Sequence, residues 1–207
     1  MKTILATTAL LLSAQAVAAA PVYLNKDNIT VSLGASMAAE PFENTTTAQA
    51  LSNVIDAPSA SATETHTQSS HVWVSSKSLE LDFDFGTEYD LTALHLWNYH
   101  TEAYDVDTID FKFYDAANSL VGSLLSTPSL GVGVVQSAQT YLLSFPARVQ
   151  YVNAVLSGDN GQVDFNNIGF TGEVSPPIPE VPLPASLPLL AGALGLFAAM
   201  RGRRRGL

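Results

Sequence analysis

The 207-residue sequence contains no cysteine, which excludes disulfide scaffolds, cysteine-ligated zinc sites and thiol catalysis. Charged residues are also scarce, at 14 % against about 25 % in an average soluble domain. Between Lys26 and Glu180 only four basic residues accompany 19 acidic ones, which gives this span a formal charge of −15. A surface of this sign repels phosphate backbones, so we expect no nucleic-acid binding.

Residues 1–18 have the pattern of a signal peptide. Lys2 supplies the positive start, Thr3–Leu12 is apolar, and Ala16-Val17-Ala18 places small residues at a cleavage site. We expect a signal peptidase to cut after Ala18 and the remaining chain to be exported; an uncleaved membrane anchor is the alternative. An exported chain without cysteine fits a bacterial envelope.

The other end of the chain has the pattern of a membrane anchor. A proline-rich linker, residues 174–180, leads to the 18 uncharged residues Leu183–Met200. As a helix this stretch is about 27 Å long, close to the thickness of a hydrocarbon core. A basic cluster then follows, which by the positive-inside rule stays in the cytoplasm and leaves the preceding chain outside. Its members are Arg201, Arg203, Arg204 and Arg205.

Residues 181–207 together resemble the PEP-CTERM class of bacterial sorting signals, in its VPLPA variant. The motif is Val181-Pro182-Leu183-Pro184-Ala185, and the apolar segment and arginine tail follow it in the order typical of the class. The resemblance implies an exosortase-type transpeptidase that cuts near the motif and releases or re-attaches the protein at the cell surface. A plain C-terminal anchor is the alternative.

Between these ends, residues 22–173 show the patterns of strands and no convincing helical periodicity. Apolar and acidic residues alternate over Leu79–Phe85, and a similar alternation covers Thr108–Tyr114. Val149–Leu156 is apolar on both faces, which predicts a central strand. A bulge at Asn166-Asn167 would bring the apolar residues on either side of it into one register. These segments predict an all-β, antiparallel sandwich or barrel.

The order of these segments resembles the discoidin or coagulation-factor C-type domain, a galactose-binding-like jelly roll. The most specific pieces are LHLWNY at Leu94–Tyr99 and ARVQYVNAVLSGDNG at Ala147–Gly161. The resemblance implies a jelly-roll β-sandwich that binds sugars, phospholipid headgroups or proteins through loops at one end. The expected chain is therefore a jelly-roll sandwich flanked by a signal peptide and a transmembrane helix.

Many members of that family hold a structural calcium ion. Here Asn53, Asp56 and Asn167 are the residues that would contribute oxygens to one. Asn167 stands where the family often has glutamate, and Ala57 follows Asp56 where many members have glycine. Because calcium takes about six to eight oxygen ligands, the sequence leaves calcium binding open.

The residues after the strand Ala93–Asn98 combine aromatic rings with hydrogen-bonding groups, which is a composition that suits a sugar. We expect ligand contacts from this loop; a solvated turn is the alternative. The candidate residues are Tyr99, His100, Glu102, Tyr104 and Asp105.

Other conspicuous residues have a structural interpretation. Trp73 and Trp97 are expected in the core, and Ser59–Ser70 is expected to be a mobile, polar surface coil. Histidines at 66, 71, 95 and 100 lack the HxH or HxxxH spacing, so we expect no transition-metal site.

The carboxylates do not identify a catalytic pair. Glu80, Asp82 and Asp84 lie on one exposed strand face, where weak calcium binding would relieve their repulsion. No GxSxG, P-loop or GxGxxG motif is present. We therefore expect an exported, membrane-anchored and then sorted bacterial surface protein that binds carbohydrate, with exopolysaccharide as the ligand. The alternatives are a structural matrix protein acting by protein contacts and, less favoured, an enzyme acting on polysaccharide.

Overall fold

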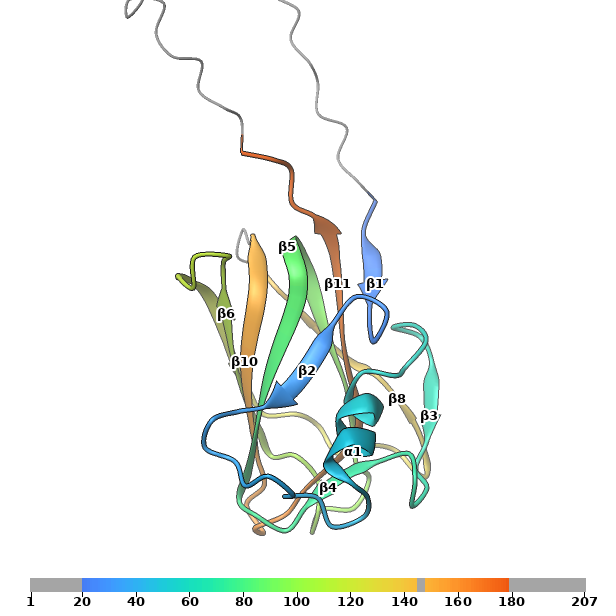
Figure 1. The fold of residues 1–207 in the computed structure, drawn as a ribbon. Helices are drawn as coiled ribbons and strands as arrows, with labels where there is room; N and C mark the ends of the chain where they lie inside the picture. The colour runs from blue at the N-terminus through green and yellow to red at the C-terminus, as the bar shows by residue number, and fades with distance from the viewer. Residues whose placement is uncertain (1–19, 145–147, 179–207) are drawn as a thin grey trace, which may run out of the picture. The chain divides into compact units, whose positions relative to one another are not determined.

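The computed structural model describes residues 20–144 and 148–178 (Figure 1). Contacts divide the chain into the units Met1–Ser175 and Pro176–Leu207. The signal peptide and the sorting signal expected from the sequence lie outside the described residues. Within those residues, no helix combines the length and hydrophobicity needed to span a bilayer. The elements are β1 (Val22–Leu24), β2 (Thr30–Leu33), α1 (Thr47–Val54), β3 (Thr63–Thr65), β4 (Val72–Val74), β5 (Ser78–Asn98), β6 (Thr108–Tyr114), β7 (Leu120–Ser126), β8 (Val135–Ser137), β9 (Gln139–Leu142), β10 (Val149–Ser157) and β11 (Val163–Val174).

Strand β5 connects the two layers of a sandwich. Its first half pairs with β2 and β10, and its second half pairs with β11 and β9. Gly86, with a φ of +68°, lies between the halves, where the partners of the strand change from β10 to β11. The first layer continues from β10 through β6 to β7, and β11 also pairs with β1 and β4. Every strand pair is antiparallel, which confirms the expected antiparallel sandwich.

The hydrophobic pattern decides which face of each strand is buried. Leu79, Leu81 and Phe83 are at most 1 % exposed, while the acidic residues between them point to the other face. Strand β10 lies between β5 and β6, so the predicted central strand is confirmed. The register of β11 shifts between Phe165 and Asn167, which confirms the predicted bulge.

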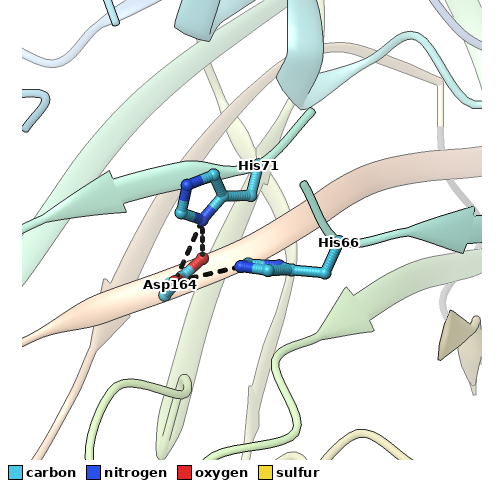
Figure 2. Close-up of side chains that lie close together, drawn as sticks. All are labelled: His66, His71 and Asp164. Carbon is cyan, nitrogen blue, oxygen red and sulfur yellow. Dashed lines mark hydrogen bonds and ion pairs between the residues drawn. The ribbon is translucent and has the colours of Figure 1, made fainter. Parts of the chain in front are cut away.

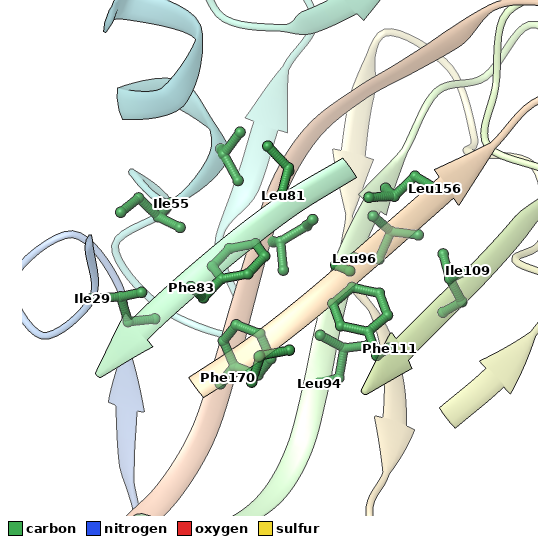
Figure 3. Close-up of a cluster of buried hydrophobic side chains, with 14 of the residues drawn as sticks. Ile29, Ile55, Leu81, Phe83, Leu94, Leu96, Ile109, Phe111, Leu156 and Phe170 are labelled. Carbon is green, nitrogen blue, oxygen red and sulfur yellow. The ribbon is translucent and has the colours of Figure 1, made fainter. Parts of the chain in front are cut away.

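Aromatic rings from both layers meet in the core (Figure 3). Phe170 of β11 packs edge-on against Phe83 and Phe85 of β5 and against Phe111 of β6, with ring centroids 5.5, 5.2 and 6.4 Å apart. Such tilted contacts add to the stabilisation that ring burial already provides. This central packing ties the first layer to β11, the strand that also enters the candidate site.

Two sequence expectations about irregular regions are wrong. The sequence shows no convincing helical periodicity, yet the domain contains helix α1. The eight residues of α1 bury only Ala50, Asn53 and Val54, which is too few to mark a helix in the sequence. The segment expected to be coil between Ser59 and Ser70 contains β3, which pairs with β8 in a separate two-stranded sheet. Both elements are too short to leave a periodic signal.

Strand β11 runs the length of the sandwich. Its beginning, at Val163–Phe165, pairs with β4, and its end, at Phe170–Gly172, pairs with β1 (Figure 1). At about 3.3 Å per residue, Asp164 and Val174 are about 33 Å apart. Strand β11 therefore ends at the end of the sandwich opposite to β4.

Candidate functional site

A cavity of about 400 Å³ opens at the end of the sandwich where β4 and β11 begin. We call it the end pocket. Its lining comes from the segment after β3, the start of β4, the loop after β5 and the start of β11. The lining residues are His66, Thr67, Gln68, His71, Trp73, Tyr99, Tyr104 and Asp164.

Strand pairing fixes the floor of the end pocket. Trp73 and Asp164 are direct partners in the antiparallel pair of β4 and β11, and His71 immediately precedes β4. His66 follows β3, and its backbone N–H donates to the carbonyl oxygen of Val134 at 2.8 Å. His66 and Asp164 are nearly 100 residues apart in the sequence, yet their side chains line the same pocket.

Aromatic rings form one wall of the end pocket. The Trp73 and Tyr104 ring centroids are 6.2 Å apart, and those of Tyr99 and Tyr104 are 6.3 Å apart. The Trp73 indole N–H donates to Gln162 Oε1 at 2.7 Å, which holds the half-buried ring in place.

The expectation that Trp73 lies in the core is therefore wrong. Its neighbours Val72 and Val74 are fully buried, and strand alternation turns Trp73 to the opposite face. Trp97 is buried as expected, and its indole N–H donates to the carbonyl oxygen of Ala62 at 2.9 Å.

Two histidines and an aspartate converge on the floor, as Figure 2 shows. His71 Nδ1 lies 2.9 and 3.0 Å from the carboxylate oxygens of Asp164. His66 Nε2 lies 3.8 Å from Asp164 Oδ2, and His66 Nδ1 lies 3.1 Å from Asn166 Oδ1. Although His66 and His71 lack metal-binding spacing in the sequence, the turn between β3 and β4 brings them together.

Burial sets the electrostatics of this group. Asp164 is 3 % exposed, and burial raises the pKa of its carboxyl although His71 opposes the shift. Burial also lowers the pKa of His66, against the opposing effect of Asp164. His71 Nε2 and His100 Nδ1 are buried and find no hydrogen-bond partner among the described residues. The floor, at His71, and the adjoining loop, at His100, therefore hold polar atoms that bond to no other described residue.

The loop predicted to bind ligand contributes only part of its residues to the end pocket. Tyr99 and Tyr104 line it, and the His100 ring packs edge-on against Tyr99 with centroids 4.5 Å apart. Glu102 is exposed, and its backbone oxygen accepts a hydrogen bond from Asn160.

Asp105 is turned inward from this loop. Its side chain accepts a hydrogen bond from Asn98 Nδ2 at 3.4 Å, and the residue is 4 % exposed. Burial, with smaller contributions from Asp107 and Glu102, raises the pKa of Asp105 to about 6. Its place is beneath the loop, outside the residues that line the end pocket.

Most of the pocket floor escapes sequence reasoning. His66, His71 and Asp164 have no motif spacing, because pairing of β4 with β11 is what brings them together. Gln68 lies in a polar stretch without any distinguishing pattern. Trp73 does carry a signal, since it alternates with two valines that must face the core.

The residues considered for calcium are already bonded to one another or to the backbone. Asn167 Nδ2 donates to Asp56 Oδ1 at 2.9 Å, and Asn167 Oδ1 accepts from the Ala57 N–H at 2.9 Å. Asn53 Oδ1 accepts from Gln49, and its Nδ2 donates to the Ser69 carbonyl oxygen. A calcium ion needs about six to eight free oxygens. These residues do not fit that ion unless these hydrogen bonds break, so the proposed function does not include calcium.

A second hollow, of about 600 Å³, lies over the outer face of β5 between β2 and β10. We call it the acidic groove; it contains Glu80, Asp82 and Asp84 beside Tyr114, Tyr151 and Asn153. Asn153 Nδ2 donates to Glu80 Oε1 at 2.9 Å and to Asp82 Oδ1 at 2.8 Å. Hydrogen bonds from Ser36 and Asn153 lower the pKa of Glu80. The fold itself thus stabilises the charged form of Glu80.

The chain matches no protein-family model, and it matches no curated protein. Similarity to known proteins therefore comes from solved structures alone.

The chain is similar to the crystal structure of an F5/8 type C domain from Bacteroides fragilis, with a TM-score of 0.51 and 10 % identity over 75 % of this chain and 98 % of that one. A fucose-binding module from Streptococcus pneumoniae has a TM-score of 0.45 and 12 % identity over 72 % and 93 %. The family 32 module of C. perfringens NanJ, solved with galactose, has a TM-score of 0.45 and 10 % identity over 73 % and 98 %. At these identities the likeness concerns the fold alone. The fold is an antiparallel β-sandwich similar to that of an F5/8 type C domain.

Proposed function

We propose that the sandwich is a non-catalytic carbohydrate-binding domain that holds a neutral sugar in the end pocket. The observation that carries this proposal is the wall of Trp73, Tyr99 and Tyr104 beside side chains that donate and accept hydrogen bonds. A pyranose ring has an apolar face that stacks on such rings and hydroxyl groups that bond to such side chains. The fold, similar to an F5/8 type C domain, supports the same reading.

Charge favours a neutral ligand over an acidic one. The span from Lys26 to Glu180 carries a formal charge of −15, which repels uronic acids and sulfated sugars at low ionic strength. The end pocket itself contains the Asp164 carboxylate, an acceptor for hydroxyl groups. Among the described lining residues Asp164 is the one carboxylate, whereas glycoside hydrolysis ordinarily uses a pair.

We also propose that the protein works outside the cell, on exopolysaccharide. The leader pattern of residues 1–18 and the VPLPA-type pattern of residues 181–207 support export, anchoring at the inner membrane and later sorting by an exosortase-type enzyme. Strand β11 ends at Val174, whereas the pocket lies where this strand begins, at Asp164. A domain held through its C-terminal side would thus keep the end pocket free for ligand. The mass of the mature surface form tests this part, since it reports both cleavages; a mass equal to the whole chain contradicts it.

Screening the full chain on an array of neutral glycans, followed by titration calorimetry with the best ligand, tests the sugar site. Trp73→Ala and Tyr99→Ala should each weaken binding at least about tenfold, because each removes an aromatic surface worth about 1.4 kcal/mol or more. Tyr151→Ala is the matched control, since it removes an aromatic ring from the acidic groove. No retention of any glycan, or equal losses in all three variants, would overturn the proposed site.

A further inference from the structure

The floor of the end pocket brings together three side chains of the kind that bind transition metals. His66, His71 and Asp164 offer donor atoms that all lie within 4.8 Å of one another. Figure 2 shows the carboxylate of Asp164 between the two imidazole rings. His71 is 6 % exposed and Asp164 is 3 % exposed, so this is a built cluster and not a solvated surface pair.

One contact in the cluster is left incomplete by the protein alone. Asn166 Oδ1 can only accept, so a His66 Nδ1 that lies 3.1 Å away carries the hydrogen. The lone pair of the neutral imidazole is then on Nε2, which faces Asp164 Oδ2 across 3.8 Å. That distance is too long for a hydrogen bond, and two electron-rich atoms facing each other favour a cation between them.

The groups around the cluster hold its donor atoms in position. Asn166 orients His66 through Nδ1, which is the usual role of a group that supports a metal-ligating histidine. The backbone oxygen of His71 accepts hydrogen bonds from Asn44 at 2.9 Å and Asn53 at 3.5 Å. Asp164 is fixed by the pairing of β11 with β4. The three donors are therefore arranged before any ligand arrives.

We propose that His66 Nε2, His71 Nδ1 and the Asp164 carboxylate bind a divalent transition-metal ion of the zinc type. The metal would take the place of the hydrogen between His71 and Asp164, the His71 ring then carrying its one hydrogen on Nε2, and would fill the gap between Asp164 and His66. This inference does not depend on the proposed sugar binding.

The spacing of the donors suits such an ion. In a tetrahedral site with bonds of about 2.0–2.1 Å, ligand atoms are about 3.3 Å apart. For Asp164 Oδ2, the observed separations of 3.0 Å from His71 Nδ1 and 3.8 Å from His66 Nε2 lie on either side of that value. Two imidazoles and a carboxylate make a donor set that zinc favours, whereas calcium requires oxygen ligands. A fourth ligand would be left to water or to a molecule in the end pocket, which all three residues line.

Zinc titration of the full, untagged chain after chelator treatment tests the inference. We expect one high-affinity site per chain by calorimetry. His66→Ala and Asp164→Asn should each reduce the affinity for zinc at least about tenfold. Asp82→Asn is the matched control, because it makes the same carboxylate-to-amide change in the acidic groove, and it should leave the high-affinity site unchanged.

The wild-type chain provides a test that does not depend on variant folding. In proton NMR spectra, zinc should shift the imidazole signals of His66 and His71 and leave that of His95, which bonds to Thr140 and Thr171, unmoved. Absence of a one-to-one zinc site, unshifted His66 and His71 signals, or an equal loss of affinity in Asp82→Asn would each overturn the proposal. Glycan binding is measured separately with chelator present, so failure of one proposal leaves the other standing.

Discussion

The end pocket and the acidic groove both combine carboxylates with aromatic rings, yet they use their polar atoms in opposite ways. In the groove, Asn153 bridges Glu80 and Asp82, and hydrogen bonds lower the pKa of Glu80. In the end pocket, burial raises the pKa of Asp164, and His71 Nε2 has no partner among the described residues. The groove is the larger hollow, but its polar groups already stabilise the fold.

This difference shows why neither hollow size nor the number of acidic residues identifies a site. A partly exposed carboxylate that already accepts hydrogen bonds from the protein gains little free energy from a ligand. A buried polar atom without a partner carries an energetic penalty that a ligand can remove. Substitutions in the end pocket and in the acidic groove should therefore change the stability of the protein by different amounts.

The largest expected effect comes from a glycine that supports the end pocket. A Cβ at Gly158 would lie 1.6 Å from the backbone oxygen of Gln162, whose side chain holds the Trp73 indole. Since backbone must move, Gly158→Ala should lower the free energy of unfolding by about 3 kcal/mol.

Gly34, beside the acidic groove, is the comparison. A Cβ there would lie 2.2 Å from Glu80 Cγ and 2.8 Å from Glu80 Cβ, so rotation of that side chain relieves only part of the overlap. Gly34→Ala should therefore lower the same free energy by about 2 kcal/mol, less than the backbone overlap at Gly158. Urea denaturation of the two variants measures both values. A greater loss in Gly34→Ala would contradict the expectation that the backbone overlap at Gly158 is the harder one to relieve.

A smaller effect, about 1–2 kcal/mol, is expected from Asp105 beneath the pocket loop. Its pKa rises from 3.8 to about 6 on folding, so between these values the native state binds more protons than the unfolded chain. Stability should therefore fall as pH rises from about 4 to about 6 and stay level above that.

Asp105→Asn isolates this contribution, because asparagine does not titrate. Thermal unfolding at a series of pH values should show that the stability of the variant does not fall in this way between about pH 4 and about pH 6. Relative to wild type, the variant should therefore be more stable at neutral pH than at pH 4. An unchanged profile would mean that Asp105 ionises normally in the native protein.

The smallest effect, about 1 kcal/mol, is expected in the acidic groove. Asn153→Ala removes the donor shared by Glu80 and Asp82 and leaves two carboxylates without it. Because folding lowers the pKa of Glu80, the charged Glu80 stabilises the native state at neutral pH. This stabilisation is lost as the pH falls below the ordinary pKa of 4.5. The gap between wild type and variant should thus close in acid, as measured by chemical denaturation at pH 7 and pH 3. A gap that widens in acid would contradict this reading.

The sequence is sufficient for the strands that form the core. The alternation around Phe83, the central position of β10 and the bulge before Asn167 all follow from apolar spacing, because each strand must bury one face. Helix α1 and strand β3 could not be predicted in this way. Each is stabilised by contacts with distant segments, as the pairing of β3 with β8 shows.

The candidate site is less accessible to sequence reasoning than the fold. Tyr99 and Tyr104 follow a strand end, so their place at the pocket could be predicted from the loop position. His66 and His71 meet Asp164 only after β4 pairs with β11, across more than 90 residues, and no local pattern records that pairing. Trp73 lies between these cases, because its alternation with Val72 and Val74 indicates an outward position.

The two tryptophans allow the most direct test of the end pocket as the sugar site. Trp73 lies in its wall, and Trp97 is buried and bonded to Ala62. In nitrogen–proton NMR spectra of the full chain titrated with galactose, fucose, glucose and mannose, at least one sugar should move the Trp73 indole signal and leave that of Trp97 in place. Sugar-dependent shifts at Asn153 of the acidic groove with an unmoved Trp73 signal would contradict the account.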